Sequence, residues 1–155
     1  MNYFTKQFPI YLLLVWMIFS CKTYSESDIK KFDEEITSFI KNKEWNMQKL
    51  ESGLYYEIIV PGDTSATIKL TDNVTFGYKG SFINGESFQT VRTSQPVTFQ
   101  ARTLIAGWQD ALSLIGNKGK IRIILPPHLG YGAKETGVIP ANSILVYELE
   151  VVDVE

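Results

Sequence analysis

Few side chains in this sequence can act as nucleophiles or metal ligands. The 155 residues include one cysteine, Cys21, and one histidine, His128. One cysteine cannot form an intramolecular disulfide, and these two residues together cannot supply a His/Cys metal site. A Ser-His-Asp triad would depend wholly on His128, which stands in the turn-forming stretch Pro126-Pro127-His128 and is expected in a surface loop. The composition therefore removes several enzyme classes before any motif is considered.

The overall composition narrows the class of protein further. Hydrophobic residues make up 45% and charged residues 21% of the chain, which is typical of a globular domain rather than of a disordered chain or a coiled coil. Fifteen Lys and Arg against seventeen Asp and Glu give a net charge of −2. This weakly acidic balance argues against nucleic acid as a partner. The length fits one ordinary domain with a short appendage.

Cys21 follows an apolar segment that begins the chain. Residues 8–19 are almost wholly apolar, and Lys6 is the one charged residue before Cys21. Twelve helical residues would span about 18 Å, which is too short for a transmembrane helix across a hydrocarbon core of about 30 Å. This length indicates a signal peptide, which we place at residues 1–20. The sequence Ile18-Phe19-Ser20-Cys21 resembles the bacterial lipoprotein processing site, in which the cysteine thiol is acylated. We expect Cys21 to hold the chain on a lipid bilayer of the bacterial cell envelope, facing the periplasm; the alternative is an ordinary cleaved signal with an incidental cysteine.

Residues 21–52 are interpreted as the acylated cysteine, a linker and an amphipathic helix. The helix is predicted over residues 28–42, because apolar residues recur there at helical spacing, and Ser25 with Asp28 has the spacing of a helix cap. The apolar side chains of this helix are Ile29, Phe32, Ile36, Phe39 and Ile40. They must be buried on the chain's own domain, which we favour, on a second copy or on a partner.

From residue 53 onward the hydrophobic pattern changes to period two, which indicates strands. Val74, Phe76 and Tyr78 alternate with polar or small residues, and Asn84-Gly85 predicts a type I′ hairpin turn after that strand. One short helix is predicted near residues 106–114, where it buries Trp108. Several antiparallel strands and one helix predict an α+β domain over residues 53–155, with the helix on one face of a curved sheet.

Five segments, in order and with matching spacing, resemble the FKBP-type peptidyl-prolyl cis-trans isomerases. They are Val74–Gly80, Asn84–Phe88, Leu104–Leu112, Leu129–Ala133 with Gly137–Pro140, and Ile144–Val151. The resemblance implies a five- or six-stranded antiparallel half-barrel wrapped around the short helix, with an apolar pocket between them. It implies proline-containing polypeptide clients and macrolide-type ligands as partners. It also implies a reaction that needs neither a metal nor a cofactor, in agreement with the cysteine and histidine counts.

Carried over position by position, the resemblance assigns ten pocket residues. The catalytic group would be Tyr78, Phe88, Gln89, Trp108 and Tyr131, and the substrate-binding group Phe99, Leu104, Ile105, Ile139 and Tyr147. Trp108 would form the floor, while the Tyr131 hydroxyl and the backbone N–H of Ile105 would contact carbonyls of a bound Xaa-Pro segment. Phe76 and Leu149 are interpreted as ordinary core.

One position departs from the family pattern. The family usually has an aspartate after the Phe88 position, and its carboxylate accepts a hydrogen bond from the tyrosine at the Tyr78 position; here the residue is Gln89. We expect either a weakened isomerase or a module that binds proline segments as a chaperone or scaffold of an envelope complex. The layout of lipidated cysteine, helix and single domain also resembles the gliding-motility-associated isomerase lipoproteins, although no residue here specifies motility.

Overall fold

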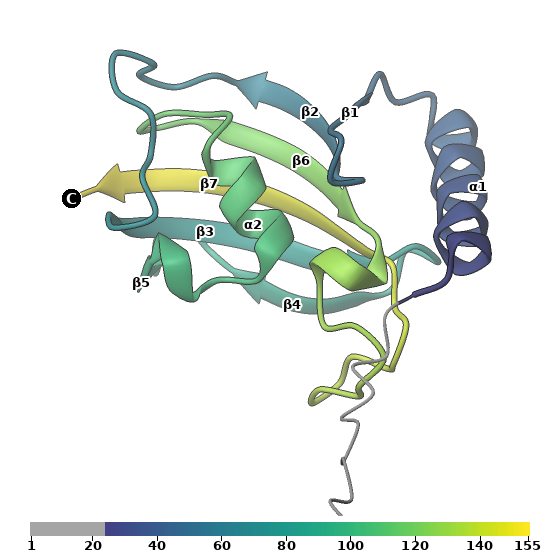
Figure 1. Ribbon diagram of the computed structural model, residues 1–155. Helices are drawn as coiled ribbons and strands as arrows, with labels where there is room; N and C mark the ends of the chain where they lie inside the picture. The colour runs from purple at the N-terminus through teal and green to yellow at the C-terminus, as the bar shows by residue number, and fades with distance from the viewer. Residues whose placement is uncertain (1–23) are drawn as a thin grey trace, which may run out of the picture.

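The computed structural model describes residues 24–155, which are built on one antiparallel sheet. The expected signal peptide and Cys21 lie outside the described residues. The strands follow the order β1-β2-β6-β7-β3-β4, and β5 also pairs with β3 (Figure 1). Their bounds are β1 Gln48–Lys49, β2 Tyr55–Val60, β3 Asn73–Phe82, β4 Ser87–Val91, β5 Val97–Gln100, β6 Lys120–Leu125 and β7 Leu145–Val154. The expected α+β class is confirmed, and the seven strands of this sheet exceed the expected five or six because residues 48–49 add a short strand.

The helix α2 (Ala106–Leu112) covers one face of the sheet. Side chains of β6 and β7 that share this face pack around it in one core, because successive residues of a strand point to opposite faces. Their buried members include Ile121, Ile123, Leu145 and Leu149. The helix ends at Leu112, earlier than predicted, and it buries Trp108 as expected.

The helix α1 (Glu26–Lys43) packs on the opposite face of the same sheet. Ile124 and Val146 point away from α2, and they are nevertheless buried because Ile36 of α1 lies in the same cluster. The capping box between Ser25 and Asp28 is present and begins the helix. Ile36, at the centre of the apolar stripe, is therefore buried on the chain's own domain, as we favoured from the sequence, whereas Ile29 in the first turns is 44% exposed.

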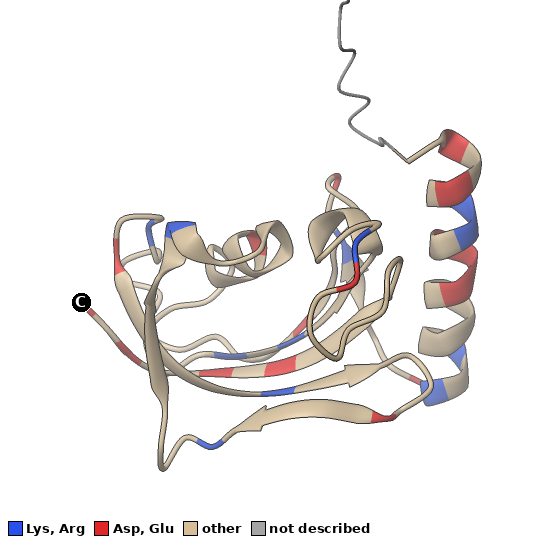
Figure 2. Cartoon of the chain, turned by 90° about the horizontal axis from the view of Figure 1, so that it is seen from below, with Lys and Arg blue, Asp and Glu red and all other residues tan. Residues whose placement is uncertain are grey.

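The rest of this outer face carries paired charges, in addition to those spread along α1 (Figure 2). The Arg122 guanidinium contacts Glu57 at 2.7 Å and Glu148 at 2.9 Å. Each of these residues sits on a different neighbouring strand, so the ion pairs run across β2, β6 and β7. A charged outer face limits where α1 can dock to the apolar patch around Ile124 and Val146.

The hairpin between β3 and β4 forms where predicted, but its turn differs from the prediction. A type I′ turn requires a positive φ at both Asn84 and Gly85, whereas only Gly85 has one, at 90°. The Gly85 N–H donates to the Phe82 carbonyl, and the Phe82 N–H donates to the Glu86 carbonyl. These bonds define a longer hairpin loop with glycine in the left-handed position, so the predicted turn type is wrong.

Candidate functional site

A cavity of about 290 Å³ opens between α2 and the face of the sheet that α2 covers. Aromatic and aliphatic side chains dominate its lining, and none of the lining residues carries a formal charge at neutral pH. The lining residues are Phe76, Tyr78, Gln89, Phe99, Thr103, Leu104, Ile105, Trp108, Tyr131 and Tyr147. The structure thus brings eight of the ten predicted site residues around one space.

Trp108 lies deep in this cavity, and close packing of α2 on the sheet fixes its position. A Cβ at Gly107 would lie 2.3 Å from Cδ2 of Leu125, so only glycine allows the helix to approach β6 this closely. The Trp108 side chain is 5% exposed. Its Nε1 is buried and has no hydrogen-bond partner in residues 24–155. Packing alone therefore holds the indole.

Three rings pack edge-on around the indole. The ring centroids of Phe76, Tyr78 and Tyr147 lie 5.1, 5.0 and 5.0 Å from that of Trp108, all in T-shaped arrangements. Phe76 was interpreted from sequence as core only, yet it lines the cavity as well as being buried. Its alternation with Tyr78 along β3 places both rings on the same face, and this was the signal that could have identified it.

Phe88 does not line the cavity, contrary to the sequence expectation. Its ring lies over Gly80 of β3 and needs the space that glycine leaves: a Cβ there would lie 2.6 Å from the Phe88 ring and 2.8 Å from the Tyr147 ring. Phe88 contacts Tyr147 in that space, with ring centroids 5.7 Å apart. Phe88 therefore supports Tyr147, which does line the cavity.

Ile139 is the second predicted site residue outside the lining. It is 6% exposed and belongs to the buried core, where the backbone pairing of Thr136 with Ile139 holds it. In contrast, Thr103 lines the cavity and was not predicted. Thr103 ends the short helix η1 (Ala101–Thr103), and its placement depends on the turn into α2, for which no sequence pattern gave a signal.

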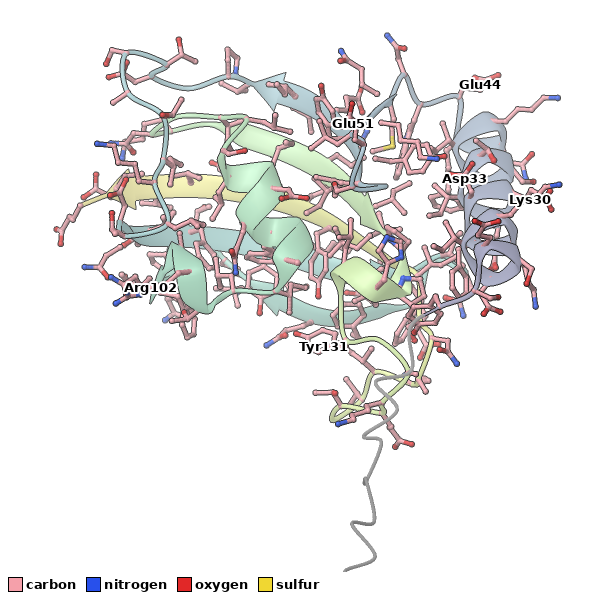
Figure 3. The ribbon with its side chains drawn as sticks, in the orientation of Figure 1. Lys30, Asp33, Glu44, Glu51, Arg102 and Tyr131 are labelled. Atoms are coloured by element: carbon pink, nitrogen blue, oxygen red, sulfur yellow. The ribbon has the colours of Figure 1, made fainter. Side chains whose placement is uncertain are left out.

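The rim of the cavity is formed by residues that remain in contact with solvent. Phe99 is 50% and Tyr131 is 36% exposed, and Gln89 is also exposed. Figure 3 shows Tyr131 below α2, on the segment that follows the short helix η2 (Pro127–Leu129). Exposed aromatic groups at the mouth and a buried indole at the bottom make a site that can take an apolar ring from solvent.

The phenols of Tyr78 and Tyr147 are held in their protonated form. Burial, followed by the neighbouring Tyr131, raises the pKa of Tyr78 and also that of Tyr147. At neutral pH these hydroxyl groups are therefore hydrogen-bond donors. Within the described residues the Tyr78 hydroxyl has no partner, and the bond to Gln89 that the family pattern suggests is not formed.

The backbone adds one more donor at the mouth. Ile105 is the N-cap residue of α2, and its N–H makes no hydrogen bond to any of residues 24–155. Within residues 24–155, no three His, Cys, Asp or Glu side chains lie close enough together to hold a metal ion. The arrangement can bind an apolar ring and donate hydrogen bonds to carbonyl groups near it.

Comparison with known proteins matches the same region to one family. The family model of FKBP-type peptidyl-prolyl cis-trans isomerases matches residues 64–152. FkpA, an FKBP-type peptidyl-prolyl cis-trans isomerase of Buchnera aphidicola, is 39% identical over 110 residues, which cover 70% of this chain and 44% of that protein. A probable FKBP-type isomerase of Haemophilus influenzae is 38% identical over 144 residues, covering 89% and 58%.

Solved structures show the same fold. The crystal structure of FkpA from Escherichia coli superposes with a TM-score of 0.73 at 33% identity, covering 83% of this chain and 60% of that one. A peptidyl-prolyl isomerase from Pseudomonas syringae gives a TM-score of 0.67 at 25% identity, covering 86% and 97%. The chain spans about half the length of the curated relatives it matches, 44% and 58% for the two named above.

Proposed function

This chain belongs to the FKBP-type peptidyl-prolyl cis-trans isomerase family, and we propose that its cavity accelerates rotation about Xaa-Pro bonds of exported polypeptides. The observation that carries this proposal is the buried Trp108 indole beneath an uncharged aromatic lining. A proline ring has the size and polarity to lie on that indole. The reaction breaks no covalent bond, so a lining without charged groups is compatible with it.

The cavity favours the twisted amide through its low polarity. Delocalisation holds the peptide bond planar against a barrier of about 18–20 kcal/mol and places negative charge on the carbonyl oxygen. Water stabilises that charge, whereas the twisted state has lost the delocalisation and has a smaller dipole. Removing water therefore destabilises the planar amide more than the twisted one, which is differential binding of the transition state.

Hydrogen-bond donors at the mouth hold the flanking chain while the bond rotates. The Tyr131 hydroxyl and the free N–H of Ile105 lie on the same cavity, so both can donate to carbonyl groups of a peptide whose proline lies over Trp108. Fixing the carbonyls against a fixed ring biases the bond toward the twisted geometry. Each 1.4 kcal/mol gained in this way raises the rate about tenfold.

A direct assay of isomerisation tests this proposal. A chain that begins at Lys22 keeps all of residues 24–155, and its effect on a proline-containing peptide can be followed by NMR exchange spectroscopy. The uncatalysed reaction takes tens to hundreds of seconds. We expect acceleration that a macrolide-type FKBP ligand inhibits, and Trp108→Leu should remove most of it. A chain that folds but gives the uncatalysed rate would exclude the enzyme.

A second function is favoured by one feature of the site, the exposed Gln89 without a bond to Tyr78. Without a carboxylate partner, the Tyr78 ring is held less firmly, and the cavity would bind proline segments more effectively than it rotates them. The protein would then act as a proline-segment-binding chaperone or scaffold of an envelope complex, such as a gliding-motility complex. Peptide-induced NMR shifts at Trp108 without acceleration would support this function over the enzyme.

We also propose that Cys21 carries a lipid that anchors the domain to a membrane of the cell envelope. Support comes from the sequence Ile18-Phe19-Ser20-Cys21 and from Cys21 being the only cysteine in the chain. No helix within residues 24–155 has the length and apolar character needed to cross a membrane. Stable anchoring needs more than one acyl chain, because a single chain binds only marginally. Intact-mass spectrometry of membrane-purified protein should show the acyl mass on an N-terminal Cys21, and an unmodified thiol would exclude the anchor.

A further inference from the structure

The loop between η2 and β7, residues 130–143, is tied to the point where the described chain begins. The Tyr24 hydroxyl donates to Oδ1 of Asn142 at 2.8 Å, and the Tyr24 ring packs edge-on against Phe32 of α1 at 5.4 Å. Asn142 in turn donates its N–H to the carbonyl of Gly132, which closes the base of the loop. Figure 1 shows this loop and the start of α1 at the same end of the molecule.

The tip of this loop presents an apolar side chain to solvent. Thr136 and Ile139 exchange two backbone hydrogen bonds, so Gly137 and Val138 form a tight turn at the tip. Val138 is 72% exposed, more than any other large apolar side chain of residues 24–155. The charged residues of the loop are Lys134 and Glu135, which cancel. An uncharged tip with an exposed valine is suited to a neutral or weakly polar surface.

The proposed lipid must lie close to this loop. Cys21 precedes Tyr24 by three residues. Even a fully extended chain therefore places the Cα atom of Cys21 within about 11 Å of the Cα atom of Tyr24. Tyr24 itself is bound to Asn142. An acylated Cys21 would therefore hold a bilayer surface within reach of the loop, whatever path residues 22 and 23 take.

We propose that the loop of residues 130–143 is a membrane-contact surface, with Val138 entering the bilayer interface. This inference rests on the proposed acylation of Cys21. One valine buries too little apolar area to bind a bilayer by itself, so the acyl chains provide the affinity and the loop sets the orientation. Because the loop carries no net charge, the contact does not depend on anionic lipids.

The orientation has a consequence for the clients of the cavity. Tyr131 stands at the start of the loop and also lines the cavity, so the loop that carries the proposed contact also forms part of the cavity rim. The substrate class is then proline-containing segments that lie near the membrane surface, such as chains that are leaving a membrane-bound export or assembly machine. The Tyr24–Asn142 hydrogen bond ties the beginning of the described chain to this same loop.

Depth-sensitive fluorescence on the anchored protein tests the contact. In Val138→Cys the new thiol is the only free one, because an acylated Cys21 is blocked; it can be labelled with an environment-sensitive dye and the protein reconstituted into phosphatidylethanolamine–phosphatidylglycerol vesicles. Leu70→Cys is the matched control, since Leu70 is also apolar and is 51% exposed, on the segment between β2 and β3 at the opposite end of the molecule (Figure 1). We expect a blue shift, a several-fold emission increase and quenching by spin-labelled lipids for the Val138→Cys label only, unchanged at high salt.

The outcomes separate the contact from the anchor. Protein that floats with the vesicles and carries acyl mass, but whose Val138→Cys label is as solvent-exposed as the Leu70→Cys label, overturns the contact and leaves the anchor standing. Protein that carries no acyl mass and does not float overturns the anchor, and the membrane contact with it. Isomerase activity, measured on the chain that begins at Lys22, is independent of both results.

Discussion

Replacing Gln89 with aspartate would offer the Tyr78 hydroxyl a charged acceptor that it lacks. Gln89 lines the cavity together with Tyr78, and the Tyr78 hydroxyl has no partner among residues 24–155. The Tyr78 ring packs edge-on against Trp108, with ring centroids 5.0 Å apart. A hydrogen bond that restricts the Tyr78 ring therefore also restricts the Trp108 indole at the bottom of the cavity. Turnover should therefore rise in Gln89→Asp.

The size of the effect follows from the type of hydrogen bond. A bond to a charged acceptor contributes about 1.5–3 kcal/mol, against about 1 kcal/mol for a neutral pair. The introduced carboxylate would therefore stabilise the ring by about 0.5–2 kcal/mol more than a neutral side chain can. Expressed fully in the twisted state, that difference gives about a twofold to thirtyfold increase in rate.

NMR exchange spectroscopy on a proline-containing peptide measures this rate, and Gln89→Asn is the matched control. Asparagine has the size of aspartate without its charge, so the difference between the two variants isolates the charge. The bond to Tyr78 lowers the pKa of the introduced carboxyl below its usual value of about 3.9. The gain is then fully present above that pH and is lost as the pH falls through the lowered pKa. Equal rates in the two variants at pH 7 would refute the role assigned to position 89.

Three further predictions concern packing and charge. Trp108→Leu should lower the free energy of unfolding by about 2 kcal/mol in urea titrations, because it empties part of a buried site, and should abolish peptide binding. Gly107→Ala should destabilise by about 1–3 kcal/mol despite better helix propensity, because its Cβ would overlap the fully buried Leu125, and unaltered stability would contradict the close packing of α2. Burial opposes a lowered pKa at Asp33, but the hydrogen bonds that it accepts from Lys49 and Tyr55 lower the pKa below its usual value. The stabilisation from these bonds is present above about pH 4 and is lost as the pH falls through the lowered pKa. Asp33→Asn should therefore reduce the acid-induced loss in free energy of unfolding by less than about 1 kcal/mol.

The sheet and its two helices could be predicted because the hydrophobic periods were clear. On β7, Leu145, Tyr147 and Leu149 alternate with residues of the other face, and this alternation is what the structure shows. Val146 broke the pattern as an apolar residue on the outer face. Val146 lies where α1 covers that face, so an apolar residue at this outer position is explained by the docking of the helix.

The residues that line the pocket were harder to predict, because a side chain's position depends on the size of the residues that lie between it and the cavity. Phe88 reaches Tyr147 only because Gly80 has no side chain, and the effect of that missing side chain lies on the neighbouring strand. The predicted turn type of the hairpin was wrong for a related reason. Asn84-Gly85 suits a two-residue turn locally, but the bulge that offsets Ser81 against Ser87 lengthens the loop and leaves glycine alone with positive φ.

The position of α1 on the face opposite the cavity separates the docked helix from the binding site. The cavity opens on the α2 side of the sheet, whereas Ile36 is buried against Ile124 and Val146 on the other side. Helix docking therefore cannot fill or close the cavity, and changes in α1 should alter stability without altering peptide affinity. The link between α1 and the site runs instead through Tyr24 and Asn142, because that bond joins the beginning of the helix to the loop that carries Tyr131.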